Sequence, residues 1–441
     1  MTREAFHRIA DHLRSLLRGA EAFTCHLSGE ESDFVRFNRG RIRQAGSVRQ
    51  AHLTIDLIEG KRHAAVIVTL GGDFAADREL VAEVVEELRR QRAELPEDPY
   101  LLFPDDVRST EHVGRGRLPE PAEAIEAIGA VAAERDLVGL FASGEISTGF
   151  ADSRGQRNWH SLPSFHFDWS VYVEEDRAVK GSYAGTEWSA AELERKAAVA
   201  AAHVEALRRP VVTAPPGRYR VFLAAEALWE VFGVLSWGGF GLRAHRTKTT
   251  PLLRMVEEGA RLHPSVEVYE SAVSGIAPRF QESGFLRPDR VTLVERGEYR
   301  DCLVSPRSAA EYGAPCNGAS RAEAPQSLEM APGELPAAEA LEHVGDGIYV
   351  SYLHYLNYSD RPAGRLTGLT RFATFAIRGG EIAGPLRVMR FDESIYRMLG
   401  ENLRGLTRER TRLFEPGTYD RRSTDAALLP GALVDDFRLT L

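Results

Sequence analysis

The sequence has few of the residues that define several large classes of protein. Cysteine occurs three times in 441 residues, at Cys25, Cys302 and Cys316, with no C-x-x-C spacing. This usage excludes a disulfide framework and predicts a reducing, cytoplasmic environment. No apolar run is long and uninterrupted enough to cross a membrane, and residues 1–18 lack the apolar core of a signal peptide. We therefore expect no membrane association.

The sequence also lacks an excess of positive charge. Lysine and arginine number 55 and aspartate and glutamate 64, which gives a formal net charge of -9. A surface that binds nucleic acid or anionic lipid needs clustered cations to neutralise phosphates. The composition therefore argues against direct binding to DNA or to a lipid surface.

The common motifs of hydrolases and nucleotide-binding proteins are missing as well. The chain contains no G-x-S-x-G, no G-x-x-x-x-G-K-[ST] and no H-x-x-x-H, and its 13 histidines are scattered. Cys302 alternates with apolar residues, which is typical of a small core side chain, whereas Cys316 lies in a predicted loop. No spacing identifies a base that would activate either thiol.

What the sequence does contain is enough apolar residues, 43%, to build more than one core. The clearest linker is Ala214-Pro215-Pro216-Gly217, which follows a helix predicted over residues 190–207. We therefore predict two domains, residues 1–212 and residues 213–441.

The first domain shows alternating hairpin and helix patterns. Helices are predicted near the N-terminus, from Asp77 to Leu95 and over residues 122–135, and hairpins over residues 34–44 and 52–69. Residues 165–173 alternate strictly, so Phe165, Phe167 and Trp169 share a buried face. The opposite face, with His166 and Asp168, is expected to be solvated, the alternative being the wall of a cleft.

The second domain begins with a strand and an apolar helix predicted over residues 223–242. Leu228, Phe232 and Leu235 are spaced for one buried helix face. Gly238 and Gly239 then weaken the helix, since each glycine costs about 1 kcal/mol relative to alanine in a helix interior. The pair indicates either a locally widened turn or a helix end packed tightly against a strand.

The rest of this domain reads as strands joined by one long loop. Strands are predicted over residues 291–297, 347–350 and 429–437, and a hairpin over residues 372–386. Residues 319–340 are rich in proline, glutamate and alanine, and we expect them to form a mobile loop.

These segments, in this order, resemble the TldD/PmbA family, also called modulators of DNA gyrase. Its active members resemble zinc metalloproteases and carry H-E-x-x-x-H on the helix after the first strand of the second domain. Over that motif, Trp237 and Leu242 fall on the histidines and Gly238 on the glutamate. None of these side chains can bind zinc or polarise a water molecule. Active members also use a late cysteine, and this chain has none after Cys316.

The resemblance implies an α+β fold of two domains, each with a mainly antiparallel sheet and packed helices. It also implies a PmbA/TldE-like subunit without zinc, which forms a heterodimer with a TldD-like metalloprotease that supplies zinc and acts on unstructured peptides. Two alternatives remain open. In the first, the chain is a self-associating binding or regulatory protein, such as a homodimer, without a protease partner. In the second, it is an enzyme with reassigned chemistry.

A run of aromatic and polar residues in the second domain is a candidate contact with peptide. Alternation along residues 351–360 predicts Tyr352, His354 and Tyr358 on one face and Tyr355 on the other. Tyrosine offers an apolar body with a polar tip, which suits contact with varied peptides. The alternative is an ordinary sheet whose aromatic face packs on the apolar helix.

Overall fold

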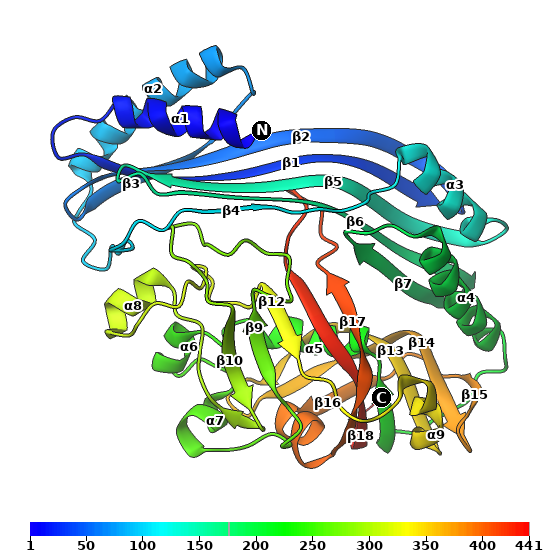
Figure 1. The fold of residues 1–441 in the computed structure, drawn as a ribbon. Helices are drawn as coiled ribbons and strands as arrows, with labels where there is room; N and C mark the ends of the chain where they lie inside the picture. The colour runs from blue at the N-terminus through cyan, green and yellow to red at the C-terminus, as the bar shows by residue number, and fades with distance from the viewer. Residues whose placement is uncertain (175–176, 441) are drawn as a thin grey trace.

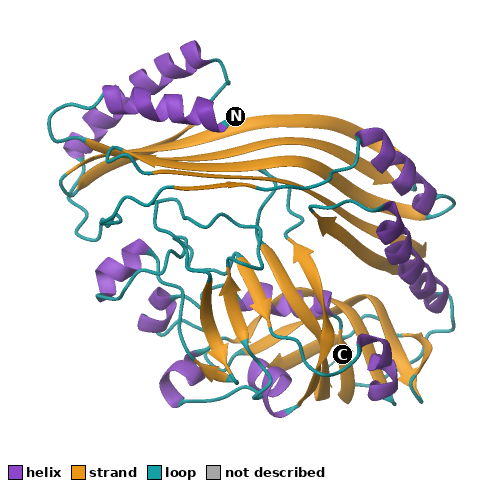
Figure 2. Cartoon of the chain, viewed as in Figure 1, coloured by secondary structure: helices purple, strands orange, loops and turns teal. Residues whose placement is uncertain are grey.

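The computed structural model describes residues 1–174 and 177–440 and contains two β-sheets with helices packed on them (Figures 1 and 2). The strands of the first sheet are β1 Ala22–Asn38, β2 Arg41–Glu59, β3 Arg62–Thr69, β4 Thr110–Val113, β5 Asp136–Asp152, β6 Arg157–Glu174 and β7 Arg177–Gly185. Its helices are α1 Arg3–Ser15, α2 Phe74–Glu94, α3 Pro121–Ala132 and α4 Ala190–Leu207. The strand order is β3-β2-β1-β5-β6-β4, with β7 also paired to β6.

The second sheet contains eleven described strands. They are β8 Gly217–Leu223, β9 Val268–Ser271, β10 Arg290–Glu295, β11 Glu298–Tyr299, β12 Ser327–Met330, β13 Gly347–Asp360, β14 Arg365–Arg378, β15 Glu381–Pro385, β16 Arg390–Ser394, β17 Leu403–Phe414 and β18 Ala426–Leu439. The accompanying helices are α5 Ala225–Leu235, α6 Leu242–Arg246, α7 Leu253–Glu258, α8 Pro306–Tyr312 and α9 Ala340–Val344. Short helical turns, η1 and η2, cover Ala337–Glu339 and Arg397–Glu401.

Pairing in the second sheet closes on itself. β8 pairs with β13 on one side and with β18 on the other, and β14 and β16 connect β13 back to β18. A closed ring of strands leaves no edge within the ring unpaired. The apolar side chains of these strands are buried together with those of α5. The fold is thus mixed α and β with mainly antiparallel sheets, as predicted.

The first sheet is longer than its sequence pattern indicated. The strands predicted at residues 34–37 and 42–44 are the ends of β1 and β2, which pair over their whole common length. α2 begins at Phe74, before the predicted Asp77, because Asp73 caps it by accepting hydrogen bonds from the N–H groups of Ala75 and Ala76. No helix within the described residues is both long and apolar enough to cross a membrane.

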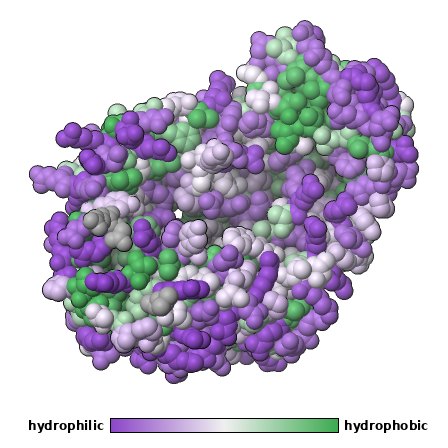
Figure 3. Space-filling model, turned by 180° about the vertical axis from the view of Figure 1, so that it is seen from behind, coloured by the Kyte–Doolittle hydropathy of each residue, from purple (hydrophilic) through white to green (hydrophobic). Residues whose placement is uncertain are grey.

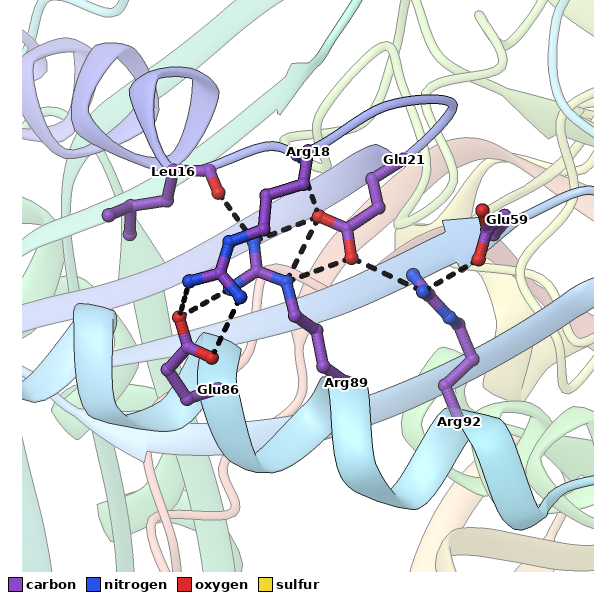
Figure 4. Close-up of polar contacts among 7 residues, drawn as sticks. All are labelled: Leu16, Arg18, Glu21, Glu59, Glu86, Arg89 and Arg92. Carbon is purple, nitrogen blue, oxygen red and sulfur yellow. Dashed lines mark hydrogen bonds and ion pairs between the residues drawn. The ribbon is translucent and has the colours of Figure 1, made fainter.

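A buried ion-pair network ties α1 and β1 to α2 (Figure 4). Glu21, which precedes β1, accepts hydrogen bonds from Arg89 Nε at 2.8 Å and from Arg92 Nη2 at 3.2 Å. Arg92 also bonds Glu59 of β2. Burial raises the pKa of Glu21, but the Arg89 hydrogen bonds and the nearby cations outweigh it, and the net shift is downward. The charged carboxylate therefore stabilises this corner of the sheet above its unfolded pKa of about 4.3.

Residues 319–340 do not form the predicted mobile loop. They contain β12, whose four residues are all buried between β9 and β18, and the turn η1. The prediction was wrong because it weighed composition, whereas Leu328 and Met330 are buried in the core and the segment pairs with two strands.

The two sheets are joined by the loop of residues 415–425, which leaves β17, reaches the first sheet and returns as β18 (Figure 1). Arg422, at its tip, is 3% exposed. Its guanidinium donates to Ser32 Oγ, to the Gly144 carbonyl and to both the carbonyl and the hydroxyl of Ser164, at 2.6 to 3.3 Å. Burial lowers the Arg422 pKa to about 10, so the group remains charged at neutral pH.

The polar face of β6 is only partly the solvated face that alternation predicted, because His166 is buried whereas Asp168 and Tyr172 are half-buried. His166 is buried close to Arg422, and its pKa falls to about 3 because of burial and of that cation. Phe165, Phe167 and Trp169 occupy the opposite, apolar face, as expected. A strand pattern separates the two faces but does not show which further element covers the polar one.

We predict that Arg422→Met lowers the free energy of unfolding by about 3 kcal/mol, because it leaves the buried Ser164 and Gly144 carbonyls without a charged donor. The exposed Arg300→Met is the matched control and is expected to change stability by less than about 0.5 kcal/mol. Urea unfolding, followed by tryptophan fluorescence, measures both. Equal midpoints for the two variants would contradict a role for Arg422 in holding the halves together.

Candidate functional site

The helix α5 lies between the two sheets and shows a different face to each side. Its buried face carries Leu228, Phe232 and Leu235, as the sequence predicted, and packs against β13 and β18. The opposite stripe recurs every three or four residues and is at least partly exposed. This stripe consists of Glu226, Trp229, Glu230 and Gly233, and the exposed Trp237 follows just after the helix.

The helix ends at Leu235, seven residues before the predicted end at Leu242. Gly238 has a left-handed φ of 78°, which a side chain disfavours. A Cβ atom on Gly239 would lie 2.2 Å from the Leu235 carbonyl oxygen. The two glycines therefore let the chain turn back tightly on the last turn of α5, and no widened helical turn forms.

The three residues that fall on the metal motif are separated by this turn. Trp237 is 56% exposed, whereas Leu242 is buried against Cys302 and Val304 in a separate small cluster. The Arg361 guanidinium donates to the Trp237 carbonyl and places a positive charge beside Gly238. These positions offer no side-chain donor to a zinc ion, and the adjacent cation would repel one.

Metal ligands are also not gathered elsewhere in the part of the chain that the structure describes. Over residues 1–174 and 177–440, no group of three or more histidine, cysteine, aspartate or glutamate side chains is arranged to hold a metal ion. Burial raises the pKa of the Cys302 thiol to about 11 and also raises that of Cys316. Neither thiol is thus activated as a nucleophile.

The predicted alternation along β13 is wrong beyond Tyr352. Register shifts between Val350 and Tyr352 and between His354 and Asn357 break the two-residue period. Tyr355 takes a left-handed φ of 58° and is 82% exposed beside the exposed His354. A bulky residue in this conformation is strained by about 1 kcal/mol, and such strain is commonly found at functional sites.

The four candidate contact residues therefore do not form one surface. Tyr352 lies in the interior, 6% exposed. Tyr358 packs on the end of α5, where its hydroxyl donates to the Val234 carbonyl at 2.9 Å and Arg361 lies over its ring. His354 and Tyr355 project from the strand between these two places, with ring centroids 5.7 Å apart.

A cavity of about 400 Å³ separates α5 and β13 from the first sheet. Its walls come from β7, α4, β8, α5 and β13, and Glu226, Lys180, Ser351 and Tyr352 are among the residues that line it. The Lys180 ammonium lies 4.7 Å from the centre of the Tyr352 ring. Such a volume and a mixed aromatic and charged lining are typical of ligand sites.

The carboxyl groups around Lys180 have raised pKa values. Burial raises the pKa of Asp168 to about 6, although Lys180 and Ser182 oppose the shift. Burial likewise raises the pKa of Glu226 and of Glu230, again against the effect of Lys180. Of these three carboxyl groups, Glu226 lines the cavity. A carboxyl group with a raised pKa at a cavity wall is a candidate functional residue.

A second and larger cavity, of about 780 Å³, lies between the first sheet and residues 278–282 and 415–425. The sheet contributes polar side chains in register, since His26 pairs with Thr54 and Ser28 with His52. The buried Gln281 side-chain nitrogen also borders it and makes no hydrogen bond within the described residues. Figure 3 shows a hollow between the two halves of the molecule and a mostly hydrophilic rim.

Residues 216–440 match a family model described as the PmbA/TldA metallopeptidase C-terminal domain. This match covers more than half of the chain. The chain belongs to the TldD/PmbA family.

Solved structures with the same fold extend the likeness over the first sheet. TldE from Thermococcus kodakarensis has a TM-score of 0.79 and 14% identity, and covers 99% of this chain and 100% of that one. A candidate modulator of DNA gyrase from Thermotoga maritima has a TM-score of 0.78 and 14% identity, with 98% and 100% covered. A similar protein from Bacteroides thetaiotaomicron has a TM-score of 0.74 and 14% identity, with 99% and 98% covered. No curated protein sequence matches the chain.

Within this TldD/PmbA fold, sequence reasoning located α5 but did not show that Glu226 and Lys180 line one cavity. Glu226, Glu230 and Gly233 are spaced like any exposed helix stripe, so periodicity separates them from the core without showing what they face. Asp168 and Lys180 come from strands more than forty residues earlier in the chain. The alternating polar face of β6 was the one pattern that singled out Asp168, on which the Lys180 charge acts.

Two glycines on α5 test the observed end of the helix. Gly233→Ala has open space at Cβ and is expected to raise the free energy of unfolding by about 0.5–1 kcal/mol, through helix propensity. Gly239→Ala meets the Leu235 carbonyl and is expected to lower it by about 2 kcal/mol. Urea denaturation of the two variants measures both changes. If both substitutions stabilise the chain, the helix continues through Gly239 and the described turn is wrong.

Proposed function

We propose that this chain is the non-catalytic subunit of a TldD/TldE-type metallopeptidase that acts on unfolded peptides. The observation that carries the proposal is the exposed stripe of α5. Glu226 of this stripe lines the cavity beside α5, in a chain whose second half matches a metallopeptidase family, yet the described residues of the stripe provide no set of zinc ligands. A TldD-like partner supplies the zinc and the general base, and this chain closes the chamber and holds the peptide.

The larger cavity supports the peptide-holding part of the proposal. Histidine, serine, threonine and glutamine side chains donate and accept hydrogen bonds without a fixed charge. Such groups satisfy the backbone amides of an extended peptide whatever its sequence. We expect the complex to act on peptides and not on DNA, because the chain carries a net negative charge. We expect it to work in the cytoplasm, because the chain has few cysteines.

A second function, self-association without a protease partner, is favoured by one edge of the first sheet. β3 covers the outer edge of β2 only over residues 52–59. Residues 41–49 of β2 are exposed on both faces, with no strand beyond them among the described residues. Such an edge pairs readily with another chain, which can be a second copy or a different protein.

Reconstitution separates these functions. We expect the purified chain to hold no stoichiometric zinc and to leave unstructured peptides intact. We expect a mixture of the chain with a partner that carries H-E-x-x-x-H to cleave these peptides, and a chelator to stop the cleavage. Elemental analysis, size-exclusion chromatography and peptide turnover measure the three expectations. Chelator-resistant cleavage by the chain alone would contradict the proposal, and a stable homodimer without effect on the partner would favour self-association.

His354 and Tyr355 remain candidates for the shared chamber or the subunit interface. We expect His354→Ala and Tyr355→Ala to weaken turnover by the reconstituted pair several-fold, because exposed aromatic side chains at an interface contribute about 1–2 kcal/mol each. Their melting temperatures should stay unchanged, since neither side chain is buried. Val273→Ala, another exposed apolar position, is the control. Unchanged turnover in both variants would remove the two residues from the site.

A further inference from the structure

The first sheet ends in a strand whose outer edge is open. β3, the last strand in the sheet order, pairs with β2 on one side and has no strand beyond it among the described residues. Just before the strand, the Asp98 N–H donates to the Lys61 carbonyl at 2.8 Å. Farther along, Ala65, Ile67 and Thr69 are exposed, Ile67 to 67%. The edge is therefore accessible from Ala65 to Thr69.

The hydrogen-bonding pattern shows which backbone groups of β3 point outward. The Leu70 N–H donates to the Ala51 carbonyl at 2.8 Å, and this bond continues the register of β2 and β3. Bonded pairs alternate with non-bonded pairs along an antiparallel ladder. The even-numbered residues of β3 therefore bond β2, and the N–H and C=O groups of Ala65 and Ile67 point away from it. These groups form no other backbone hydrogen bond within the described residues.

This open edge carries no charged side chain. Residues 64–70 read Ala-Ala-Val-Ile-Val-Thr-Leu, and Val66 and Val68 hold the strand against the core beneath α2. Folded proteins commonly blunt an edge strand with charge, proline or a bulge, because an edge without them pairs with other strands. None of these features occurs in residues 64–69, which pair with β2 without a register shift. The edge can therefore accept another strand.

The same edge borders the larger cavity. Side chains alternate along β3, so Ile67 lies on the inner face of the sheet opposite Thr54 of β2. Both residues line the cavity of about 780 Å³, together with His52 from the same face of β2. A strand added to β3 would carry every second side chain towards this cavity, next to Ile67. An extended peptide at the edge thus reaches the free backbone groups and the cavity together.

We propose that an extended segment of the peptide pairs with β3 as a further strand of the first sheet and places its apolar side chains against Ile67. This inference rests on the proposed peptide-holding function and names the class of peptide that the chain selects, uncharged segments rich in β-branched residues. Because the edge opens into the cavity, we assign it to the peptide and not to a second copy of the chain.

Such an edge also distinguishes unfolded chains from folded ones. Folded proteins pair the backbone of their apolar strands internally, whereas an unfolded chain offers an extended backbone with free N–H and C=O groups. Backbone pairing tolerates many sequences, and the side chain of Ile67 adds a preference for apolar partners at alternate positions. The edge therefore provides a physical reason for selecting unfolded segments.

Isothermal titration of the full chain with matched peptides tests the proposal. The first probe is N-acetyl-Lys-Thr-Val-Ile-Val-Thr amide, and the second carries N-methyl groups on its Val, Ile and Val residues. We expect the first to bind about tenfold more tightly, because N-methylation removes the donors that pair with the edge. A third probe, N-acetyl-Lys-Thr-Gly-Ser-Gly-Thr amide, keeps the donors, loses the apolar side chains and should also bind more weakly. Equal affinities for the first two probes would overturn the proposal.

Substitutions at Ala65 test the edge from the side of the protein. Ala65→Pro removes an outward N–H and no bond to β2, and proline is tolerated at such edge positions. It should weaken binding of the first probe about fivefold or more, whereas Ala65→Val, the matched control that keeps the N–H, should not weaken it. Unchanged binding by Ala65→Pro, in a chain shown by its melting curve to be folded, would overturn the proposal. If Ala65→Pro does not fold, the comparison of the N-methylated and unmethylated probes decides the matter.

Hydrogen exchange of the full chain locates the bound peptide. Residues 62–70 should exchange more slowly when the first probe is present, because their outward N–H groups become paired. Protection at residues 41–49 in place of residues 62–70 would move the peptide to the edge of β2 and overturn the assignment. Size-exclusion chromatography covers the remaining occupant. A dimer that Ala65→Pro dissociates, in a chain that binds no probe, would assign the edge to a second copy and overturn the proposal.

The outcome is separable from that of the proposed function. Turnover by the reconstituted pair that is the same with Ala65→Pro and Ala65→Val, without protection of residues 62–70, would overturn the inference and leave the subunit role intact. Binding of the first probe at β3 by the isolated chain, with no effect on any metallopeptidase partner, would support the edge as a peptide site and contradict the subunit role.

Discussion

The structure depends on one buried cation that holds its two halves together. Arg422 lies at the tip of a loop from the second sheet and satisfies groups on three strands of the first sheet, β1, β5 and β6. A buried guanidinium is costly unless its donors are paired, so the halves are fixed in the arrangement that pairs them. The loop that carries Arg422 also forms one wall of the larger cavity.

The two faces of α5 have different surroundings. The apolar face packs with the side chains of the closed ring of strands. The residues of the opposite stripe are at least partly exposed. Here the stripe carries Glu226, Glu230 and Gly233, which provide charge and space in place of coordination.

The sequence predicted most elements because their patterns are local. α4 has the predicted bounds, and the hairpin of β14 and β15 lies within residues 372–386 apart from its longer first strand. The errors arose where a tertiary contact decided the outcome. β12 was taken for a loop because its neighbours in the sheet, β9 and β18, are distant in sequence, and the face of β13 changed at bulges that alternation cannot show.

By itself, the sequence determined that the chain has few cysteines, no basic surface and no ligands at Trp237, Gly238 and Leu242, since these facts concern residue identity alone. It also determined the apolar faces, because burial imposes a period on each helix and strand. Only the tertiary structure decided which polar residues share a cavity. Lys180, Glu226 and Tyr352 line one cavity because elements of both sheets meet there, and the spacing of these residues along the chain does not show that meeting.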